Sequence, residues 1–525
     1  MTPPAQTRWP GLAGASPARM TSPVLVGRAP ELRWLGGALA RVRGGSPAAL
    51  LIGGGAGAGK TRLVSEFATG YAAAARVLAG RCPDLGQVGM PFAPFIAIVR
   101  ELARDPDVAG LIRAQGPELL RWLPESPPDR PPAPAGPGWA TLSGPGSPAP
   151  GIAPRQARAR LFVEVLELLE QLARRQPAVL VVEDAHWADE STMDLLSFLI
   201  GSQQAMDGVL IVVTYRSDEL RRGHPLCALL SRLDRVGWVQ RTELAGLSRA
   251  ESADLAGHLL GAEPAPSLAE HVYRRAGGNP LFVEELVWWQ GQHGKAKAAS
   301  PRDLMLAAVR RLPERTQEVL RTASARGQRT GRRLLAAATG MHAGALDACL
   351  RPAIADGVLV ADDDACVFRH SLVSEAIHTD LLPCEHTSAH HGFAAALQDA
   401  PSLVPAGWAG IEQAEHWQHV HDPARALSSA WQAAAEAGRV LACAEQLALL
   451  TRVLEIWPSV SGAERLTGTG HDHVLRQAAE AAEAAGEDQL AAALAAAARN
   501  GTDARQTLAA ARPAAPGRLL ADPVG

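Results

Sequence analysis

Short apolar runs alternate with amphipathic helical patterns over the first half of the chain. Runs of this length are typical of strands that are buried on both faces of a sheet. The predicted strands are Ala49–Ile52, Arg76–Gly80, Ala178–Val182, Gly208–Val213 and Val236–Leu244. Helices are predicted between them at Glu31–Val42, Pro91–Leu123 (interrupted by prolines), Ala157–Arg175 and Ser191–Ile200. Strands that alternate with helices favour a parallel sheet, whose ligand lies at the carboxyl ends of the strands.

From Ser248 onward the pattern is helical. Ser248 and Glu251 have the spacing of a capping box, and three predicted helices follow up to Gln290. Residues 301–390 show helices followed by a short hairpin, which is the spacing of a winged helix. Residues 391–500 are alanine-rich and predict successive helical hairpins. A strict period of about 34 residues is not visible, so the region is only TPR-like (tetratricopeptide-like).

Composition adds a segment that does not fit the pattern. Residues 124–154 contain 11 prolines and five glycines, and such a segment cannot bury enough apolar surface to fold. Elements of the sheet lie on both sides of it. It is therefore predicted to be a disordered insertion within one domain, in a chain of 525 residues that suggests roughly three or four domains.

Charge and cysteine content exclude several classes of protein. The net charge of −3 argues against a nucleic-acid-binding surface along the whole chain. Six cysteines without metal-binding spacing indicate reduced thiols and a cytoplasmic protein. No apolar run is long enough to span a membrane. Residues 1–23 lack the apolar core of a signal peptide, so we expect a disordered leader or a true start at Met20.

The first predicted strand leads into a phosphate-binding loop. The pattern Gly54-x-x-x-x-Gly59-Lys60-Thr61 follows the strand directly, and a helical pattern begins after it. Glycines allow backbone N–H groups to face phosphate oxygens, and the helix dipole favours the negative charge. Lys60 can reach the β- and γ-phosphates, and the Thr61 hydroxyl can ligate Mg²⁺. The predicted nucleotide-binding residues are Gly54, Gly55, Ala56, Gly57, Ala58, Gly59, Lys60, Thr61 and Arg62.

These elements predict an α/β P-loop NTPase with a parallel sheet, followed by a helical segment, a winged helix and an all-α, TPR-like C-terminal region. The predicted boundaries are 1–23 leader, 24–246 nucleotide-binding domain, 247–300 helical segment, 301–390 winged helix, 391–500 helical region and 501–525 disordered tail. Polar motifs end the predicted strands: Glu183-Asp184 follows one strand, and Thr214-Tyr215-Arg216 follows another. Both motifs therefore lie where a parallel sheet binds its ligand.

The chain resembles the signal-transduction ATPases with numerous domains (STAND), which are akin to AAA+ enzymes. This resemblance implies that the parallel sheet is AAA+-like and that residues 247–300 form a helical lid. Within them it is similar to the large ATP-binding regulators that end in a LuxR-type helix-turn-helix. The resemblance covers roughly residues 24–460 and rests on six motifs in the family's order. They are VGR at Val26–Arg28, the phosphate loop, VLVVEDAHWAD at Val179–Asp189, VVTYR at Val212–Arg216, GGNPLFVEEL at Gly277–Leu286 and FRHSLVSEAI at Phe368–Ile377.

The resemblance implies roles for individual residues. Arg28 would lie near the base and ribose of ATP or ADP, and Pro280 would belong to the lid motif that packs on the adenine. Glu183 and Asp184 would be the acidic pair. One would complete the Mg²⁺ shell with Thr61, the other would orient the attacking water, and which acid does which remains open. As catalytic residues we expect Asp184, Glu183 and Arg216.

Two of these roles have plainer alternatives. Arg216 would be the first sensor of the γ-phosphate, with an arginine in a structural ion pair as the less favoured alternative. His370 would contact the β-phosphate of ADP, but it could also be an ordinary partly exposed histidine. Two further histidine groups (His386, His390 and His391; His416, His419 and His421) have no accompanying cysteine or carboxylate set, so we do not predict a metal site there.

Three functions are compatible with these features. We favour an ATP-dependent switch of the transcriptional-regulator type, with slow hydrolysis and a C-terminal helical region that binds an unknown protein or small-molecule inducer. A nucleotide-dependent oligomer is an open possibility. The alternatives are a DNA binder that uses the winged helix and a constitutive AAA-type motor. A LuxR-type helix-turn-helix is not recognisable after Asn500, so we do not expect direct DNA binding by this chain. Either the protein works without such a domain or the chain is truncated.

Overall fold

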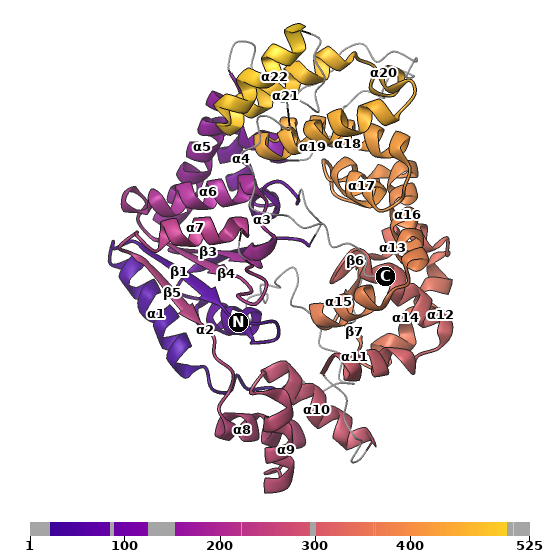
Figure 1. Cartoon of the computed structure of the whole chain (residues 1–525). Helices are drawn as coiled ribbons and strands as arrows, with labels where there is room; N and C mark the ends of the chain where they lie inside the picture. The colour runs from indigo at the N-terminus through magenta and orange to yellow at the C-terminus, as the bar shows by residue number, and fades with distance from the viewer. Residues whose placement is uncertain are drawn as a thin grey trace. The chain divides into compact units, whose positions relative to one another are not determined.

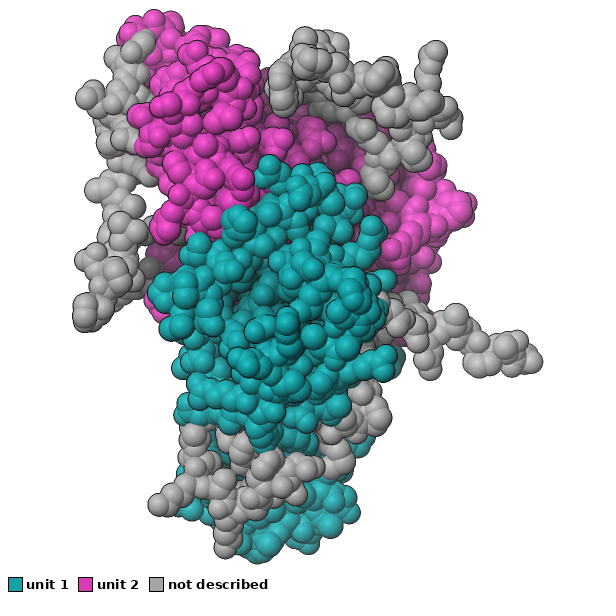
Figure 2. All heavy atoms as spheres, turned by 90° about the vertical axis from the view of Figure 1, so that its right-hand side faces the viewer, with its two compact units in different colours: residues 1–34, 53–69, 243–404 teal, residues 35–52, 70–242, 405–525 magenta. Residues whose placement is uncertain are grey.

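The computed structural model describes residues 22–84, 89–123, 153–221, 223–293, 301–360, 362, 364–500 and 508 (Figure 1). The predicted leader, the proline- and glycine-rich insertion and the predicted tail lie almost wholly outside the described residues. The described part divides into two compact units, and each is considered by itself (Figure 2). Unit 1 comprises 1–34, 53–69 and 243–404, and unit 2 comprises 35–52, 70–242 and 405–525.

Unit 2 contains the predicted sheet. Its strands are β1 (Ala48–Gly53), β2 (Arg76–Arg81), β3 (Ala178–Glu183), β4 (Val209–Thr214) and β5 (Val239–Glu243). Their order is β2-β3-β4-β1-β5, and the β2–β3, β3–β4 and β4–β1 pairs are parallel. Every residue of β1, β3 and β4 is buried, which explains why these strands are continuous apolar runs. The predicted parallel α/β fold is confirmed.

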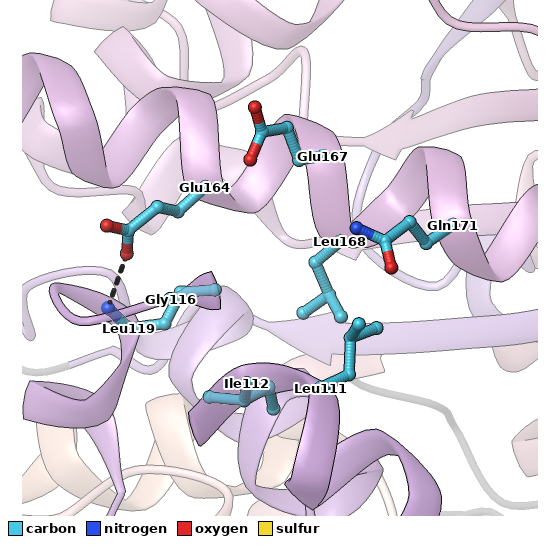
Figure 3. Close-up of a pocket in the computed structure, with 8 residues that line it drawn as sticks. All are labelled: Leu111, Ile112, Gly116, Leu119, Glu164, Glu167, Leu168 and Gln171. Carbon is cyan, nitrogen blue, oxygen red and sulfur yellow. Dashed lines mark hydrogen bonds between the residues drawn. The ribbon is translucent and has the colours of Figure 1, made fainter. Parts of the chain in front are cut away.

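Helices connect these strands. They are α1 (Ala29–Arg43), α2 (Lys60–Tyr71), α3 (Ala93–Leu102), α4 (Pro106–Gln115), α5 (Pro154–Arg175), α6 (Glu190–Gly201) and α7 (Pro225–Leu233). The apolar residues of α5 from Leu161 to Leu172 recur at helical spacing, and they are buried on one face. One carboxylate on α5 is buried as well. Glu164 accepts hydrogen bonds of 2.9 Å from the backbone N–H groups of Glu118 and Leu119 beside a small pocket (Figure 3).

The C-terminal part of unit 2 is helical. It contains α17 (Ala409–Gln418), α18 (Pro423–Arg439), α19 (Cys443–Ile456), α20 (Ala463–Thr467), α21 (His471–Ala485) and α22 (Asp488–Asn500). The longer helices pack in succession, α17 on α18, α18 on α19, α19 on α21 and α21 on α22. Buried alanines along α18 and α21 allow the helix axes to approach closely. The predicted all-α, TPR-like region is confirmed.

Unit 1 contains the segment Gly53–Thr69, a group of helices and a small sheet. Helices α8 (Arg249–Leu260), α9 (Pro266–Ala276) and α10 (Pro280–His293) share an apolar core. They are followed by α11 (Pro301–Arg310), α12 (Glu314–Ser324), β6 (Arg329–Gly331), α13 (Arg332–Thr339), α14 (Ala343–Ala355), β7 (Leu359–Val360), β8 (Ala365–Phe368), α15 (Ser371–Asp380) and α16 (Pro383–Asp399). The three short strands form an antiparallel sheet in the order β6-β8-β7.

Two further observations concern the cysteines and the length of the apolar helices. None of the six cysteines forms a disulfide. Within the described parts of the chain, no helix is both long and apolar enough to cross a membrane.

A buried glutamate joins the C-terminal helices of unit 2 to the helices around its sheet. Glu445 on α19 accepts hydrogen bonds from the Ser191 backbone N–H at 3.0 Å and from its hydroxyl at 2.5 Å. Ser191 lies in the first turn of α6, where backbone N–H groups lack partners within the helix. Burial raises the pKa of Glu445, and burial together with the charge of Glu445 raises the pKa of neighbouring Asp189.

We predict that Glu445→Ala destabilises the protein by about 1–3 kcal/mol, because a buried N–H and a buried hydroxyl lose their acceptor. Chemical denaturation followed by tryptophan fluorescence measures the change. Glu455→Ala is the matched control on the same helix. Its ion pair with Arg452 lies at the surface, so its loss should cost at most about 0.5 kcal/mol. Equal effects of the two variants would contradict the anchoring role of Glu445.

Candidate functional site

The loop Gly54–Gly59 connects β1 to α2 and has the backbone of a phosphate-binding loop. Gly57 and Gly59 have φ values of +77° and +91°, in the left-handed region that side chains disfavour. Helix α2 begins at Lys60, so the N-terminus of the helix faces the loop. The Lys60 side chain is buried, and its Nζ donates to the carbonyl oxygens of Gly54 at 2.6 Å and Gly55 at 3.0 Å. The lysine therefore lies over the loop.

The start of α10 holds this loop from outside. Asn279 Nδ2 donates to the Ala56 carbonyl at 2.7 Å, and Asn279 Oδ1 accepts from the Leu281 N–H at 3.0 Å in the first turn of α10. The packing at Gly57 leaves no room for a side chain, because a Cβ there would lie 2.8 Å from Asn279 Oδ1 and 2.9 Å from Leu281 Cβ. Glycine is therefore required at position 57 for backbone conformation and for space. The loop and the N-terminus of α10 are one packed assembly.

Arg28 holds the same loop from a second side. Its Nη2 donates to the Ala58 carbonyl at 3.3 Å and to the Ala245 carbonyl at 2.7 Å, while its Nη1 pairs with Glu31 at 3.2 Å. Only 5% of Arg28 is exposed. These contacts give Arg28 a structural role at the loop, and its predicted contact with base and ribose stays a prediction.

A buried carboxylate lies next to the start of α2. Glu284 on α10 accepts from the Ser22 N–H at 3.4 Å and lies 3.7 Å from Arg62 Nη1, and Arg62 also donates to the Ser22 carbonyl. Burial raises the pKa of Glu284 to about 7, although the Ser22 N–H and the charges of Arg62 and Arg369 act in the opposite direction. Arg369 directly precedes His370. The cluster therefore includes residues near the loop, the lid and the segment before α15.

The predicted acidic pair lies in unit 2 at the carboxyl end of β3. Arg81 at the end of β2 is in register with Glu183. Its Nη2 lies 3.3 Å from Glu183 Oε2, and its Nε lies 3.4 Å from Asp184 Oδ2. The two carboxylates raise the pKa of the Arg81 guanidinium, although burial opposes this effect. One cation thus partly neutralises two adjacent carboxylates.

Asp184 also has an unusual backbone. Its φ of +57° lies in the left-handed region, which aspartate tolerates better than most residues. Its N–H donates to the Thr214 hydroxyl at 3.1 Å, which ties the end of β3 to the end of β4. The backbone of Asp184 is therefore held in a defined conformation.

Arg216 belongs to a separate cluster beside this pair. Its side chain forms an ion pair with Glu219 and stacks on Trp187, with Cζ 5.1 Å from the ring centroid. Its backbone N–H donates to His186 Nδ1 at 3.3 Å, and His186 Nε2 lies 3.7 Å from Glu219 Oε2. Only 5% of Arg216 is exposed. The structural ion pair that the sequence left open is present, and the sensor role stays a prediction.

The remaining predicted residues are placed as follows. Thr61 lies in the first turn of α2, Pro280 is the first residue of α10, and His370 is the residue before α15. Unit 1 therefore brings together the loop, Arg28, Arg62 and Pro280, and it also contains His370. Unit 2 brings together Glu183, Asp184 and Arg216.

Sequence reasoning missed three contributors. Asn279 lies within the quoted GGNP motif, whose asparagine could have been singled out as a side chain able to bond a loop carbonyl. Arg81 directly follows the predicted strand Arg76–Gly80, so its position at the carboxyl edge of the sheet was a usable signal. His186 gave no such signal, because its pairing with the Arg216 backbone depends on how two loops meet.

Comparison with known proteins agrees with this geometry. Residues 24–213 match the family described as AAA ATPase domain, and residues 248–289 match a domain of unknown function (DUF8739). The chain therefore contains an AAA-type ATPase domain. This match confirms the predicted resemblance at the level of an AAA-type ATPase domain.

Three similar proteins illustrate the range of relatives. An uncharacterized protein of Rhizobium meliloti is 27% identical over 412 residues, which cover 69% of this chain and 36% of that protein. This chain thus spans about a third of the length of that relative. A STAND protein with a tetratricopeptide repeat sensor from Pyrococcus horikoshii is 12% identical with a TM-score of 0.43, covering 94% of this chain and 86% of the other. A Walker-type ATPase of Pyrococcus abyssi is 14% identical with a TM-score of 0.34, and the match covers 67% of this chain and 96% of the other.

The raised pKa of Glu284 predicts a pH dependence of stability. Between about pH 4.5 and about pH 7 the folded state binds a proton that the unfolded state has lost, so this residue lowers the free energy of unfolding as pH rises through that range. Glu284→Gln cannot ionise. We expect its stability relative to the native protein to increase by roughly 1–3 kcal/mol between about pH 5 and about pH 8.

Chemical denaturation at several pH values measures this difference. Glu66→Gln is the control, because Glu66 is exposed on α2 and its replacement changes the charge in the same way without a buried carboxylate. A Glu284→Gln difference that stays constant with pH would show that Glu284 is ionised throughout.

Proposed function

We propose that this chain is an ATP-dependent switch in which the nucleotide bound at Gly54–Thr61 controls the lid and the domain after it. The general basis for this proposal is the match of residues 24–213 to an AAA ATPase domain. The observation that carries the proposal is the bond from Asn279 Nδ2 to the Ala56 carbonyl, because it connects the loop directly to the first turn of α10. Arg28 adds a second connection, from the loop to Ala245 just before the lid.

These bonds make the lid sensitive to the conformation of the loop. Lys60 Nζ now donates to two loop carbonyls, and phosphate oxygens are stronger acceptors for an ammonium group. Transfer of Lys60 to a phosphate would release those carbonyls and allow the loop backbone to adjust. Since Asn279 holds Ala56, two residues after Gly54, the adjustment would reach α10.

The acidic pair supports slow hydrolysis. Carboxylate and hydroxyl oxygens are the ligands that Mg²⁺ prefers, so Thr61, Glu183 and Asp184 fit this ion by their donor chemistry. Bound Mg²⁺ would neutralise charge on the β- and γ-phosphates. We propose that Asp184, whose backbone is fixed by Thr214, orients the attacking water. Arg81 would reduce the repulsion between the two carboxylates.

The domain after the lid supplies the second half of the switch. The order α12-β6-α13-α14-β7-β8, with its antiparallel sheet, supports the predicted winged helix. We propose that His370 contacts the β-phosphate of ADP and favours the closed state. One charge-assisted hydrogen bond is worth about 1.5–3 kcal/mol, whereas full switching needs roughly 5.5 kcal/mol. His370 can therefore bias the equilibrium but cannot set it alone.

Ion pairs within unit 1 disfavour the DNA-binding alternative. Arg310 pairs with Asp380 at 3.2 Å, Arg311 lies 3.9 Å from Asp356, and Arg332 pairs with Asp347. Basic side chains that already face carboxylates give little of the uncompensated charge that attracts a phosphate backbone. We propose instead a cytoplasmic protein of the transcriptional-regulator type, whose helices α17–α22 bind a protein or small-molecule inducer.

Nucleotide binding should depend on Lys60. We predict that Lys60→Ala weakens ATP affinity by about 1.5–3 kcal/mol, or roughly tenfold to a hundredfold, because charge-assisted bonds to phosphate are lost. Calorimetric titration with ATP and Mg²⁺ measures the affinity. Arg33 is exposed on α1, so Arg33→Ala removes a positive charge away from the loop and serves as the control. An unchanged affinity of Lys60→Ala would refute the assignment of the whole loop.

Hydrolysis should depend on Asp184. Asp184→Asn keeps the size of the side chain and tolerates the left-handed backbone, so ATP binding should be retained. The rate of phosphate release should fall by at least about 100-fold, because the carboxylate acts in the transition state. If Glu183→Gln instead abolishes hydrolysis and Asp184→Asn leaves it near the native rate, the roles of the two acids are reversed.

A further inference from the structure

Three histidines from two helices meet in unit 1. His386 and His390 lie one turn apart on α16, and His378 lies in the last turn of α15. Their ring centroids are separated by 4.4 Å for His386–His390, 4.8 Å for His378–His386 and 5.8 Å for His378–His390. One ring nitrogen of each residue lies within 4.8 Å of one ring nitrogen of both others. Spacing alone did not show this group, because His378 belongs to a different helix.

The turn between the helices produces this arrangement. Helix α15 ends at Asp380, and α16 begins at Pro383, whose ring favours the first position of a helix. The Leu382 N–H donates to Glu385 at 2.9 Å, which fixes the start of α16. Helix α12 packs against both helices, and Arg321 on α12 lies 3.6 Å from Glu385. The backbone that carries the three histidines is therefore braced from one side.

A close backbone contact braces α16 from another helix. A Cβ at Gly392 would lie only 2.5 Å from the Ala338 carbonyl on α13, so the two helices touch at this glycine. His390 is two residues away and is 4% exposed, whereas His378 and His386 are half-buried. The group therefore has a rigid buried member and two members that solvent can reach.

This donor set fits a divalent transition metal. Two histidines at positions i and i+4 of a helix place both imidazoles on one face, which is a common way to bind zinc. Zinc–nitrogen bonds of about 2.0–2.1 Å in tetrahedral geometry place ligand nitrogens roughly 3.3 Å apart. The ring nitrogens now lie up to 4.8 Å apart, so the half-buried His378 and His386 side chains would rotate toward a bound ion. Neutral imidazoles suit zinc, copper and nickel, and they do not suit Mg²⁺.

The end of α15 favours a cation at this place. Backbone carbonyls at a helix C-terminus carry partial negative charge, and His378 lies within that last turn. Three imidazoles leave at least one position of a tetrahedral ion for water. An ion bound here would join the end of α15 to α16.

We propose that His378, His386 and His390 form a binding site for one divalent metal ion of the zinc class. The site is independent of the proposed nucleotide switch, because none of its residues belongs to the loop or to the acidic pair. It bears on that switch only through α15, which begins directly after His370. A bound ion would hold the far end of this helix in place.

Zinc titration of the full chain tests the site. After treatment with a chelator, the protein is titrated with Zn²⁺ in a calorimeter, and Co²⁺ absorption reports the geometry of the bound ion. We expect one ion per chain and a higher melting temperature with zinc. His378→Gln and His386→Gln should each weaken zinc affinity by roughly 100-fold and abolish the increase in melting temperature.

His391→Gln is the matched control, because His391 is exposed and follows His390 directly in the sequence. It should bind zinc as the native chain does. The proposal is wrong if the native chain binds no zinc at concentrations up to about 100 µM, far above what a protein site needs. It is also wrong if His378→Gln and His391→Gln have equal affinities, because the ion would then be held by other histidines. Thermal melting without metal shows whether each variant is folded. If His386→Gln does not fold, His378→Gln alone tests the site.

Discussion

The structure depends most on side chains that bond the backbone carbonyls of the phosphate loop from outside it. Asn279 holds Ala56, and Arg28 holds Ala58 and Ala245. A loop with positive φ values at glycines has little conformational preference of its own. The start of α10 and the segment before α1 therefore help to hold its shape. In the proposed switch, this arrangement allows helix α10 to respond to what the loop binds.

Several largely buried carboxylates join separate segments of the chain. Glu164, Glu284, Glu436 and Glu445 each accept hydrogen bonds from backbone N–H groups of another segment. Two of these contacts fall in the first turn of a helix, on Gly410 in α17 and on Ser191 in α6. Such N–H groups lack partners within their helix and carry partial positive charge. Burial raises the pKa of all four carboxylates. The same contacts that join the segments thus become sensitive to pH.

The charged side chains near the proposed site of hydrolysis each face a side chain of opposite charge. Arg81 faces both Glu183 and Asp184, whereas Arg216 faces Glu219 and stacks on Trp187. In a partly buried site an unpaired charge is costly. The two arginines are therefore held in defined positions by their acidic neighbours. In the proposed mechanism, Arg81 thereby offsets part of the charge of the two carboxylates.

The sequence by itself determined the strands, the phosphate loop and the helical character of the second half. Apolar runs such as Ala178–Val182 and the glycine spacing at Gly54–Gly59 depend only on neighbours along the chain. Only the tertiary structure decided that Asn279 reaches Ala56, that Arg81 meets Glu183, and that His378 joins His386 and His390. Each of these contacts joins residues from different elements. Their meeting depends on strand order, helix packing and turn geometry, which a local pattern does not encode.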